Sequence, residues 1–585
     1  MWNFSLRPPK SVQRNVKTDE FFSEGRGTAE SLVRESLQNC LDAMRSGQTQ
    51  VRVEYSIRHV PYKELKANWL QNLDKHLLQV RLQPDDELSD DASVRVLSIE
   101  DFNTTGLNGS LVEDDENPYF TFWWKEGTSS KSEGHGGRHG VGKSVLWGSS
   151  KMRFFFGLTV RECDGKHVLT GQATLRPHAV AGKSYDPYGH FEAAPDTEKH
   201  APFVGGHPVI RAFCEFFGLR RKNDCGLSVV IPFLDDDITE GAIIDAVVGD
   251  SFHQIADGQL VVRVGQVEIS SANIAEVADS RPNTQKLSQA IKLSQSVVKD
   301  RDAGVETVAC APDCGQLSAS IFDCDAVERL RAAWATAKRV GIRASVTVQH
   351  AKRAPMVGGV DAYILRTTDD ALAVSTYVRG RITVPFTSHK TGHDAVALLV
   401  VHEGPLSQVL GDAEKPNHRD WIKKLAKSKG YRNADRIIDF CKTLLPQLYK
   451  LINKTEDATV VKGVLSDVFS RPSGQGQKPN PPPPPTPTPS PFDIERRDGG
   501  FVVRVPSRVS EPVNFRVTAS YAPHAWSALD FAFTKSPIKF ECRGEGECTA
   551  QPGEIAVAGA KGGFMLVVTG FDQHRDLTIV TEDDS

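Results

Sequence analysis

The sequence of 585 residues has no apolar run of about 18 residues, the length that a membrane-spanning helix needs. The segment from Met1 to Lys10 lacks the apolar core of a signal peptide. The net charge of −4 is small, so charge alone predicts neither a surface that wraps nucleic acid nor a groove for acidic substrates. We therefore expect a cytoplasmic protein that makes no membrane contact.

Cysteine is sparse, with 10 residues scattered along the chain, which suits a reducing compartment. Cys310, Cys314 and Cys324 lie closest to the spacing of a zinc site, but no Cys-x-x-Cys pair or histidine completes a ligand set. A zinc site is therefore disfavoured. Cys542 and Cys548 are expected to pair only under oxidising conditions.

Length predicts three or four domains. Residues 471–491 are rich in proline and predict a stiff, extended spacer. Beyond it, residues 492–585 alternate apolar and polar positions between Gly, Pro and Asp breaks, which predicts an antiparallel β-sandwich. This module has no catalytic constellation, so we expect it to bind a protein partner.

The segment Glu35-Ser-Leu-Gln-Asn-Cys-Leu-Asp42 predicts part of a helix running from about residue 29 to 46. At 100° per residue, Glu35, Asn39 and Asp42 fall within about 60° of one another. One face can therefore be buried while the other presents two carboxylates and an amide. A solvated polar face is the alternative reading. The apolar residues on the opposite face are Val33, Leu37, Leu41 and Met44.

A second segment begins with residues 94–99, a β-branched run that predicts a strand, and Asp101 follows at its end. Asn103 and Gly106 come next, and Asn tolerates left-handed backbone better than most residues. An ordinary turn that happens to contain an Asp would give the same pattern.

A third segment, residues 134–144, is rich in glycine, whose backbone amides can approach phosphate closely. It leads into a helix expected near Lys143. The same residues also fit the P-loop pattern, but a P-loop follows a buried strand, and residues 126–134 are polar. The P-loop reading is therefore disfavoured. The candidate phosphate contacts are Gly137, Gly140, Val141, Gly142, Lys143 and Ser144.

Taken in order, the three segments resemble the GHKL superfamily of ATPases, which includes gyrase B, Hsp90, histidine kinases and MutL. The resemblance implies an α+β fold whose first domain is a two-layer α/β sandwich that binds ATP and Mg²⁺. It also implies that Glu35 is the general base that activates water and that Asn39 completes the coordination of Mg²⁺. Asp42 would support the site, and Asp101 would accept a hydrogen bond from the adenine amino group.

The second segment departs from the usual Asp-x-Gly-x-Gly pattern, because Asn103 and Thr105 stand at the glycine positions and Gly106 follows one place later. Ser228 lies where these ATPases have a threonine, so the resemblance implies a hydroxyl that helps to hold adenine through water. The alternative is that the segment around Ser228 is simply a strand with no role in binding. The aromatic run of residues 119–124 is expected to pack rather than to stack on a base.

The resemblance also implies the order of the domains. We predict an ATP-binding domain over residues 1–240, a transducer-like α/β domain over 241–410 and a basic helical segment over 411–470. In related ATPases a transducer lysine reaches the γ-phosphate, for which Lys390 and Lys415 are the candidates here. Amino-terminal arms in these ATPases cross to a partner subunit, so we expect an ATP-dependent homodimer.

Residues 419–454 hold ten Lys and Arg against three Asp, a local charge of +7. Such a segment can grip the phosphate backbone of DNA without reading its sequence, although a solvated helix face gives the same pattern. The sequence thus predicts an ATP-gated dimer clamp that serves as an accessory ATPase in bacterial DNA repair or anti-phage defence. A chaperone clamp acting on protein clients and a nucleotide-sensing scaffold remain as alternatives. Glu35 argues against the scaffold, which needs no base.

Overall fold

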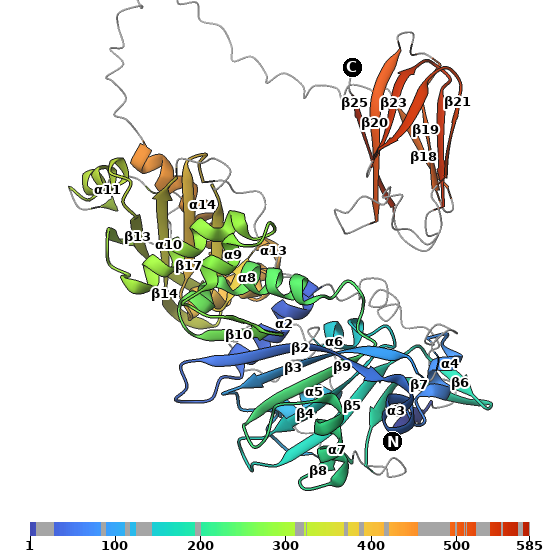
Figure 1. Cartoon of the computed structure of the whole chain (residues 1–585). Helices are drawn as coiled ribbons and strands as arrows, with labels where there is room; N and C mark the ends of the chain where they lie inside the picture. Colours follow the sequence, from blue (N-terminus) through green and yellow to red (C-terminus); the bar gives the residue numbers. More distant parts are fainter. Residues whose placement is uncertain are drawn as a thin grey trace, which may run out of the picture. The chain divides into compact units, whose positions relative to one another are not determined.

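A computed structural model of the chain describes most of its residues, and two compact units, residues 1–460 and 461–585, are described separately below (Figure 1). The described residues are 1–7, 29–82, 89, 91–111, 117–124, 143–193, 201–310, 317, 321–322, 325–367, 373–384, 391–414, 420–453, 492–497, 500–507, 509, 512–521, 539–551, 554–570 and 577–583.

The first unit begins with an 11-stranded sheet in the order β1-β7-β5-β4-β9-β3-β2-β10-β11, with β6 beside β7 and β8 beside β5. Its pairs are antiparallel except for β10 beside β2, which is parallel. The strands are β1 (Trp2–Leu6), β2 (Val51–Pro61), β3 (Ser93–Phe102), β4 (Phe154–Val160), β5 (His167–Thr174), β6 (His178–Val180), β7 (Lys183–Phe191), β8 (Phe203–Val204), β9 (Gly226–Pro232), β10 (Leu260–Val264) and β11 (Val267–Ile269).

The place of β10 and β11 corrects the predicted domain boundary at residue 240. That boundary was set just after the last nucleotide-like motif, but β10 pairs with β2 and extends the first sheet. The first domain therefore continues at least to Ile269. The strand run of residues 260–264, expected in the second domain, belongs to the first.

Helices cover both faces of the first sheet. On one face lie α2 (Ala29–Asp42), α8 (Glu240–Ala256), α9 (Ile274–Asp279) and α10 (Ser288–Lys299), which share one apolar cluster with β2 and β3. On the other lie α3 (Tyr62–Trp69), α4 (Asp74–Gln79) and α7 (Pro208–Phe217), which pack with β4 and β5 in a second cluster. The mixed α/β class is confirmed, but the two predicted layers become three where these shorter helices lie.

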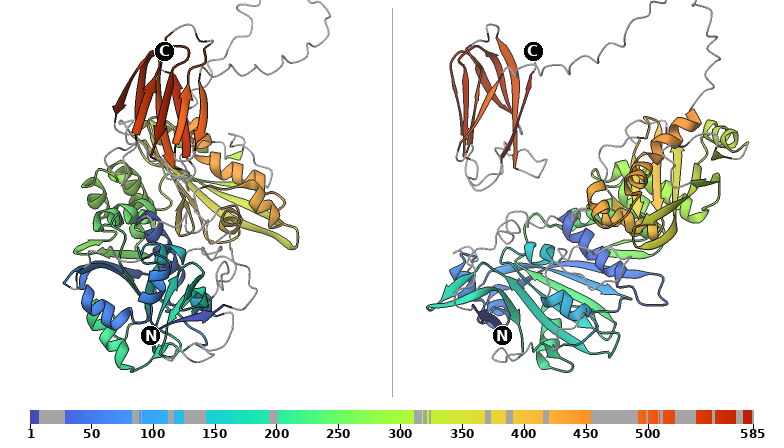
Figure 2. Two further views of the ribbon diagram at one scale, coloured as in Figure 1. Left: turned by 90° about the vertical axis from the view of Figure 1, so that its right-hand side faces the viewer. Right: turned by 180° about the vertical axis from the view of Figure 1, so that it is seen from behind.

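A six-stranded sheet follows, in the order β12-β13-β14-β17-β15-β16. Helices α12 to α14 cover one of its faces and α10 packs on the other (Figure 2). The strands are β12 (Val305–Cys310), β13 (Val340–His350), β14 (Arg353–Arg366), β15 (Ser375–Arg379), β16 (Ile382–Val384) and β17 (Ala395–Val401). The helices are α11 (Ala326–Ala335), α12 (Pro405–Asp412), α13 (Lys423–Ser428) and α14 (Ala434–Asn453).

The second unit is the predicted β-sandwich, built from two four-stranded sheets, β18-β19-β24-β21 and β22-β23-β20-β25. A disulfide between Cys542 and Cys548 joins one sheet to the other. The strands are β18 (Asp493–Arg497), β19 (Gly500–Arg504), β20 (Val513–Tyr521), β21 (Lys539–Arg543), β22 (Glu547–Gln551), β23 (Glu554–Ala560), β24 (Met565–Thr569) and β25 (Leu577–Asp583). Across the described residues of both units, no helix is long and apolar enough to cross a membrane.

The amino-terminal strand β1 is held in the chain's own sheet, where it pairs with β7. Phe4 stacks on His76 with ring centroids 4.1 Å apart, and His76 Nδ1 lies 2.7 Å from His178 Nε2. Burial, with smaller contributions from His178 and Lys75, lowers the pKa of His76 to about 4. The first residues are thus not an arm that leaves the domain. The arm was expected over the first 25 residues, and its residues 8–25 lie outside the described residues.

We predict that this cluster makes stability depend on pH. Because the pKa of His76 is lowered on folding, its contribution is present above pH 6.5 and is lost as the pH falls toward 4. Between pH 7 and pH 5 the loss should be about 2 kcal/mol. Urea denaturation at the two pH values should show a smaller drop for His76→Phe than for wild type. The exposed control His59→Phe should keep the wild-type drop, and an equal drop in all three proteins would refute the assignment.

Candidate functional site

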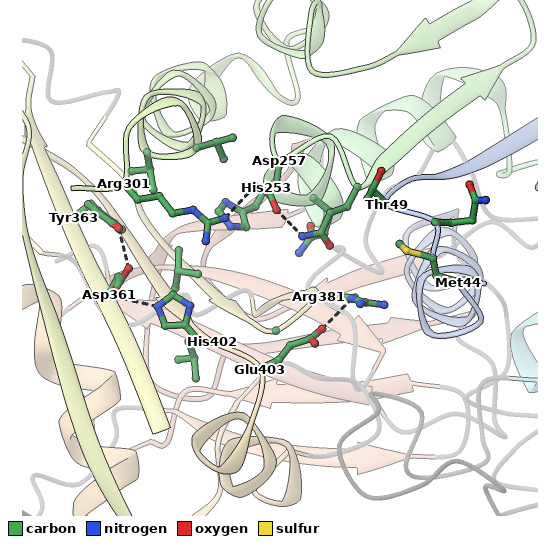
Figure 3. A pocket seen from close by; sticks show the side chains of 18 residues that line it. Met44, Thr49, His253, Asp257, Arg301, Asp361, Tyr363, Arg381, His402 and Glu403 are labelled. Carbon is green, nitrogen blue, oxygen red and sulfur yellow. Dashed lines mark hydrogen bonds and ion pairs between the residues drawn. The ribbon is translucent and has the colours of Figure 1, made fainter. Parts of the chain in front are cut away.

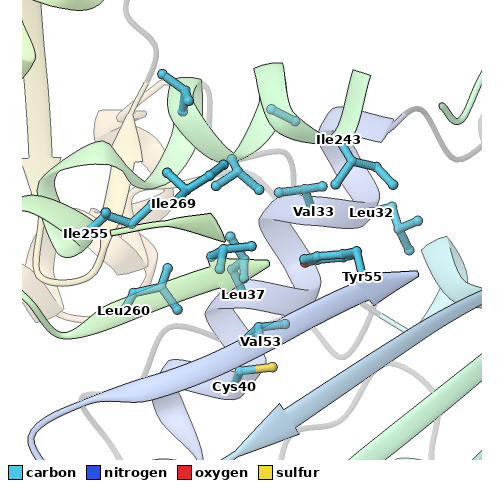
Figure 4. Close-up of a cluster of buried hydrophobic side chains, with 14 of the residues drawn as sticks. Leu32, Val33, Leu37, Cys40, Val53, Tyr55, Ile243, Ile255, Leu260 and Ile269 are labelled. Carbon is cyan, nitrogen blue, oxygen red and sulfur yellow. The ribbon is translucent and has the colours of Figure 1, made fainter. Parts of the chain in front are cut away.

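The helix α2 is buried on two faces, between the sheet and α8 (Figure 4). Leu37 packs toward the sheet, while Leu32 and Val33 meet Ile243 of α8 (Figure 4). Leu41 belongs to the same apolar cluster. The structure thus confirms the predicted helix but ends it at Asp42 rather than near residue 46.

Polar residues of α2 that face α8 and the sheet are also buried, and two of them have partners there. Arg34 Nη2 pairs with Asp250 Oδ1 of α8 at 2.7 Å, and Ser36 Oγ lies 2.6 Å from Tyr55 Oη of β2. Apart from Glu30 in the first turn, the residues of α2 that stay at least partly accessible form one stripe, Ser31, Glu35, Asn39 and Asp42. The predicted site residues Glu35, Asn39 and Asp42 lie along it.

The loop after β3 is joined to the end of α2 by backbone hydrogen bonds. Thr105 N donates to Ala43 O at 2.9 Å, and Arg45 N donates to Asn103 O at 3.0 Å. Asn103 has a φ of +65°, which confirms the left-handed backbone expected of it. The first and second sequence segments therefore form one continuous piece of structure.

Gly106 is required where it stands for two reasons. Its φ is +63°, and an added Cβ would lie 2.5 Å from Val160 O and 2.7 Å from Thr159 Oγ1. The same Thr159 hydroxyl accepts a hydrogen bond from Leu107 N and donates to Gly226 O at 3.0 Å. The loop is thereby fixed against β4 and the start of β9.

Asp101 lies on the α2 side of the sheet and is only 7% exposed. Its Oδ1 accepts hydrogen bonds from Thr104 Oγ1 at 2.5 Å and from Leu227 N at 2.8 Å. Its Oδ2 meets the thiol of Cys40 on α2 at 3.5 Å. An added Cβ on Gly226 would lie 2.4 Å from Asp101 Oδ1, so this glycine allows the strand to approach the carboxylate.

Ser228 does not face α2, which corrects the role predicted for it. Its neighbour Val229 packs in the α2 cluster, and side chains alternate along a strand, so Ser228 points to the opposite face. There its hydroxyl donates to Glu100 Oε2 at 3.0 Å and accepts from Arg221 Nε at 2.7 Å. The hydroxyl belongs to an internal network and is not offered to a ligand on the α2 side.

That network centres on Arg221, whose side chain is fully buried. Its guanidinium donates to the backbone carbonyls of Asp101 and Leu227, and Glu100 accepts hydrogen bonds from the backbone N–H groups of Arg220 and Arg221. Burial lowers the pKa of Arg221, and the nearby carboxylates Asp101 and Glu100 oppose that shift. Arg221 therefore holds the end of β3, and with it Asp101, from beneath.

The third segment is described only at its end. Lys143 caps α6 (Ser144–Gly148), which confirms the helix expected there, and its Nζ donates to Trp123 O at 3.3 Å. Trp123 is 1% exposed and stacks on Phe155, so the aromatic run packs as predicted, in α5 (Pro118–Trp124). The remaining predicted contacts lie outside the described residues and stay predictions. They are Gly137, Gly140, Val141, Gly142, Lys390 and Lys415.

A Mg²⁺ ion bound with nucleotide would suit the accessible stripe of α2. The amide of Asn39 supplies an oxygen atom, the kind of ligand that Mg²⁺ prefers. Among the described residues no group of three or more His, Cys, Asp or Glu could hold a metal ion. At nucleotide sites, phosphate and water usually supply the other ligands of Mg²⁺.

The residues that position Asp101 were not found in the sequence. Thr104 and the backbone of Leu227 hold the carboxylate, while Glu100 and Arg221 lie behind it. A signal was present, because the acidic pair at positions 100 and 101 ends an apolar strand and a basic pair stands shortly before Gly226. Acidic and basic residues placed next to two apolar strands are expected to pair with one another when they are buried.

No protein-family model and no curated protein matches the chain. Among solved structures it is similar to the ATPase region of topoisomerase II from Saccharomyces cerevisiae (9% identity, 72% of this chain and 86% of that one, TM-score 0.28). It is also similar to the ATPase and transducer domains of DNA topoisomerase II from Balamuthia mandrillaris (10%, 71% and 84%, 0.29). A third is the N-terminal domain of a DNA repair protein (10%, 74% and 97%, 0.31).

The helix that carries Glu35 and Asn39 covers the first sheet, and a second α/β domain follows it. These likenesses concern fold alone, so we build the functional proposal on the chain's own residues.

We predict that Arg221→Met destabilises the chain by about 3 kcal/mol, because it leaves Glu100 buried without its cationic neighbour. The matched control is Arg220→Met, which removes a half-exposed cation paired with Glu54. Because the buried Glu54 keeps Arg52 as a second cationic partner, this change should cost less than about 1 kcal/mol. Urea denaturation of the two variants measures the difference. Equal stability of both would show that the buried network does not hold β3.

Proposed function

We propose that the chain is a Mg²⁺-dependent ATPase whose site lies on the accessible stripe of α2. The observation that carries this proposal is the joining of two motifs. Glu35 and Asn39 lie on the stripe of α2 that stays partly accessible, and the loop that follows Asp101 is hydrogen-bonded to the end of the same helix.

In this proposal each residue has one task. Glu35 accepts a proton from the attacking water, and the amide oxygen of Asn39 binds Mg²⁺ between the phosphates. Asp101 takes the adenine amino group through Oδ2, because two donors already occupy Oδ1 and, among the described residues, Oδ2 meets only the weak donor of Cys40. Lys143 and the glycines before it approach the phosphates, with Lys390 or Lys415 at the γ-phosphate.

We further propose that ATP closes a homodimer clamp acting in DNA repair or anti-phage defence, with the β-sandwich binding a protein partner. The basic segment of residues 419–454 is the observation that favours binding to DNA. Its three Asp residues each pair with a Lys, and basic side chains remain exposed beside them while the apolar face of α14 packs on the second sheet. The exposed ones are Lys424, Lys429, Arg432, Arg436 and Lys450.

Phosphate release by wild type, Glu35→Ala and Glu30→Ala tests the proposal. Loss of the general base should lower kcat by about 10²- to 10⁴-fold. The affinity for ATP should stay within about threefold, because a general base acts on the attacking water rather than on the bound nucleotide. Glu30 lies on the same helix and is paired with Arg34, so its variant is the matched control and should retain turnover. Normal hydrolysis by Glu35→Ala would contradict the catalytic assignment.

The same assay separates the possible pathways. Duplex DNA should raise the turnover of wild type, and light scattering should show a dimer held by ATP in Glu35→Ala. Stimulation by unfolded protein instead of DNA would favour the chaperone clamp. Binding of ATP with no turnover in any protein would favour the nucleotide-sensing scaffold.

A further inference from the structure

Arg381 reaches from the second sheet to α2, the helix that carries the proposed nucleotide site. It lies in the turn between β15 and β16, and its Nη1 donates to the backbone carbonyl of Leu41 on α2 at 2.5 Å. The two residues are 340 positions apart in the sequence. Leu41 stands between Asn39 and Asp42, so this contact acts on the turn of α2 that carries the proposed Mg²⁺ ligand.

The end of α2 needs such a partner. The last turn of α2 contains no basic residue, and Asp42 places a negative charge where the helix dipole is also negative. Carbonyl groups in the last turn of a helix have no partner within the helix, and a cation there is stabilising. Arg381 therefore supplies from another domain the positive charge that the sequence of α2 lacks.

The side chain of Arg381 has a second partner besides Leu41 but remains partly exposed. Its Nε forms an ion pair with Glu403 Oε1 at 2.9 Å, and its side chain is 28% exposed. It also borders a cavity of about 500 Å³ between the end of α2, the ends of α8 and α10, and the second sheet (Figure 3). The guanidinium has room to leave Leu41 without displacing a packed side chain.

The cavity itself is better explained as part of a movable contact than as a ligand site, because its charged groups already pair with one another. Arg301 pairs with Asp257 at 3.1 Å, and His402 pairs with Asp361 at 3.1 Å (Figure 3). Each side chain of these two pairs already has a partner, so none of the four is available to bind an ionic ligand.

Within the part of the chain that the structure describes, several buried polar groups near the same contact have no hydrogen-bond partner. Gln254 of α8 lines the cavity and is 2% exposed, and neither atom of its amide is hydrogen-bonded. The same holds for the amide of Gln38 on α2, and the hydroxyl of Thr383 on β16 is also buried without a partner. Unpaired buried polar groups cost free energy, so any arrangement of the two domains that pairs them would be relieved of that cost.

We propose that Arg381 is the positioning residue through which the second sheet controls the end of α2. While its guanidinium caps Leu41, Asn39 and Glu35 are held in register with the Asp101 loop. When the second sheet shifts, the cap is withdrawn and hydrolysis slows, although nucleotide can still bind. The proposal rests on the proposed ATPase function for its catalytic effect, whereas the cap is a property of the fold.

Hydrogen exchange without nucleotide tests the cap independently of any activity. In Arg381→Ala the amides of Ala43 and Met44, which bond within the last turn of α2, should exchange about tenfold faster than in wild type. Arg381→Lys keeps a cationic donor and should restore most of the protection. Arg366→Ala is the matched control, because it removes an arginine of the same sheet that pairs with Asp394 instead. Unchanged exchange in Arg381→Ala overturns the proposal.

Steady-state kinetics test the coupling in the same variants. Arg381→Ala should lower kcat about tenfold while the affinity for ATP stays within threefold, and Arg381→Lys should recover turnover. A purely structural role would instead lower binding, turnover and thermal stability together, and would overturn the coupling. Faster exchange with unchanged kcat would also overturn it. If wild type has no turnover, the proposed function and the catalytic part of the coupling both fail, and the exchange data still decide the cap.

Discussion

The burial of α2 on two faces is the constraint on which the candidate site depends. Four of its apolar side chains are essentially inaccessible, and each contributes roughly 2 kcal/mol when buried. Hydrogen bonds at the end of the helix are each worth about 1 kcal/mol, so the core sets where α2 lies and the polar contacts adjust its last turn. The four side chains are Leu32, Val33, Leu37 and Leu41.

The same apolar cluster extends into the second domain. Tyr363, Val378 and Leu398 of the second sheet belong to the cluster that contains α2, α8 and α10. A movement of that sheet must therefore be accommodated by the helices against which α2 packs. This continuity gives a physical route by which an event at the nucleotide could alter the second domain, and it places Arg381 beside that route.

Signals local in the sequence predicted their structures well, and signals that depend on long-range packing did not. The strand before Asp101, the left-handed Asn103 and the β-sandwich each follow from neighbouring residues. Helical periodicity could not show that α8 would bury Arg34 as well, because that burial depends on a helix about 200 residues away. The face of Ser228 was missed because a strand buried on both sides shows no alternation that reveals direction.

The central claim is that the accessible stripe of α2 and the Asp101 loop form one nucleotide site. Hydrogen exchange of the full chain with Mg²⁺ and a non-hydrolysable ATP analogue tests it most directly. The account predicts that protection rises together in residues 35–45 and 101–107 and stays unchanged in the β-sandwich. Nucleotide binding that leaves both segments unprotected, or protects only one of them, would contradict it.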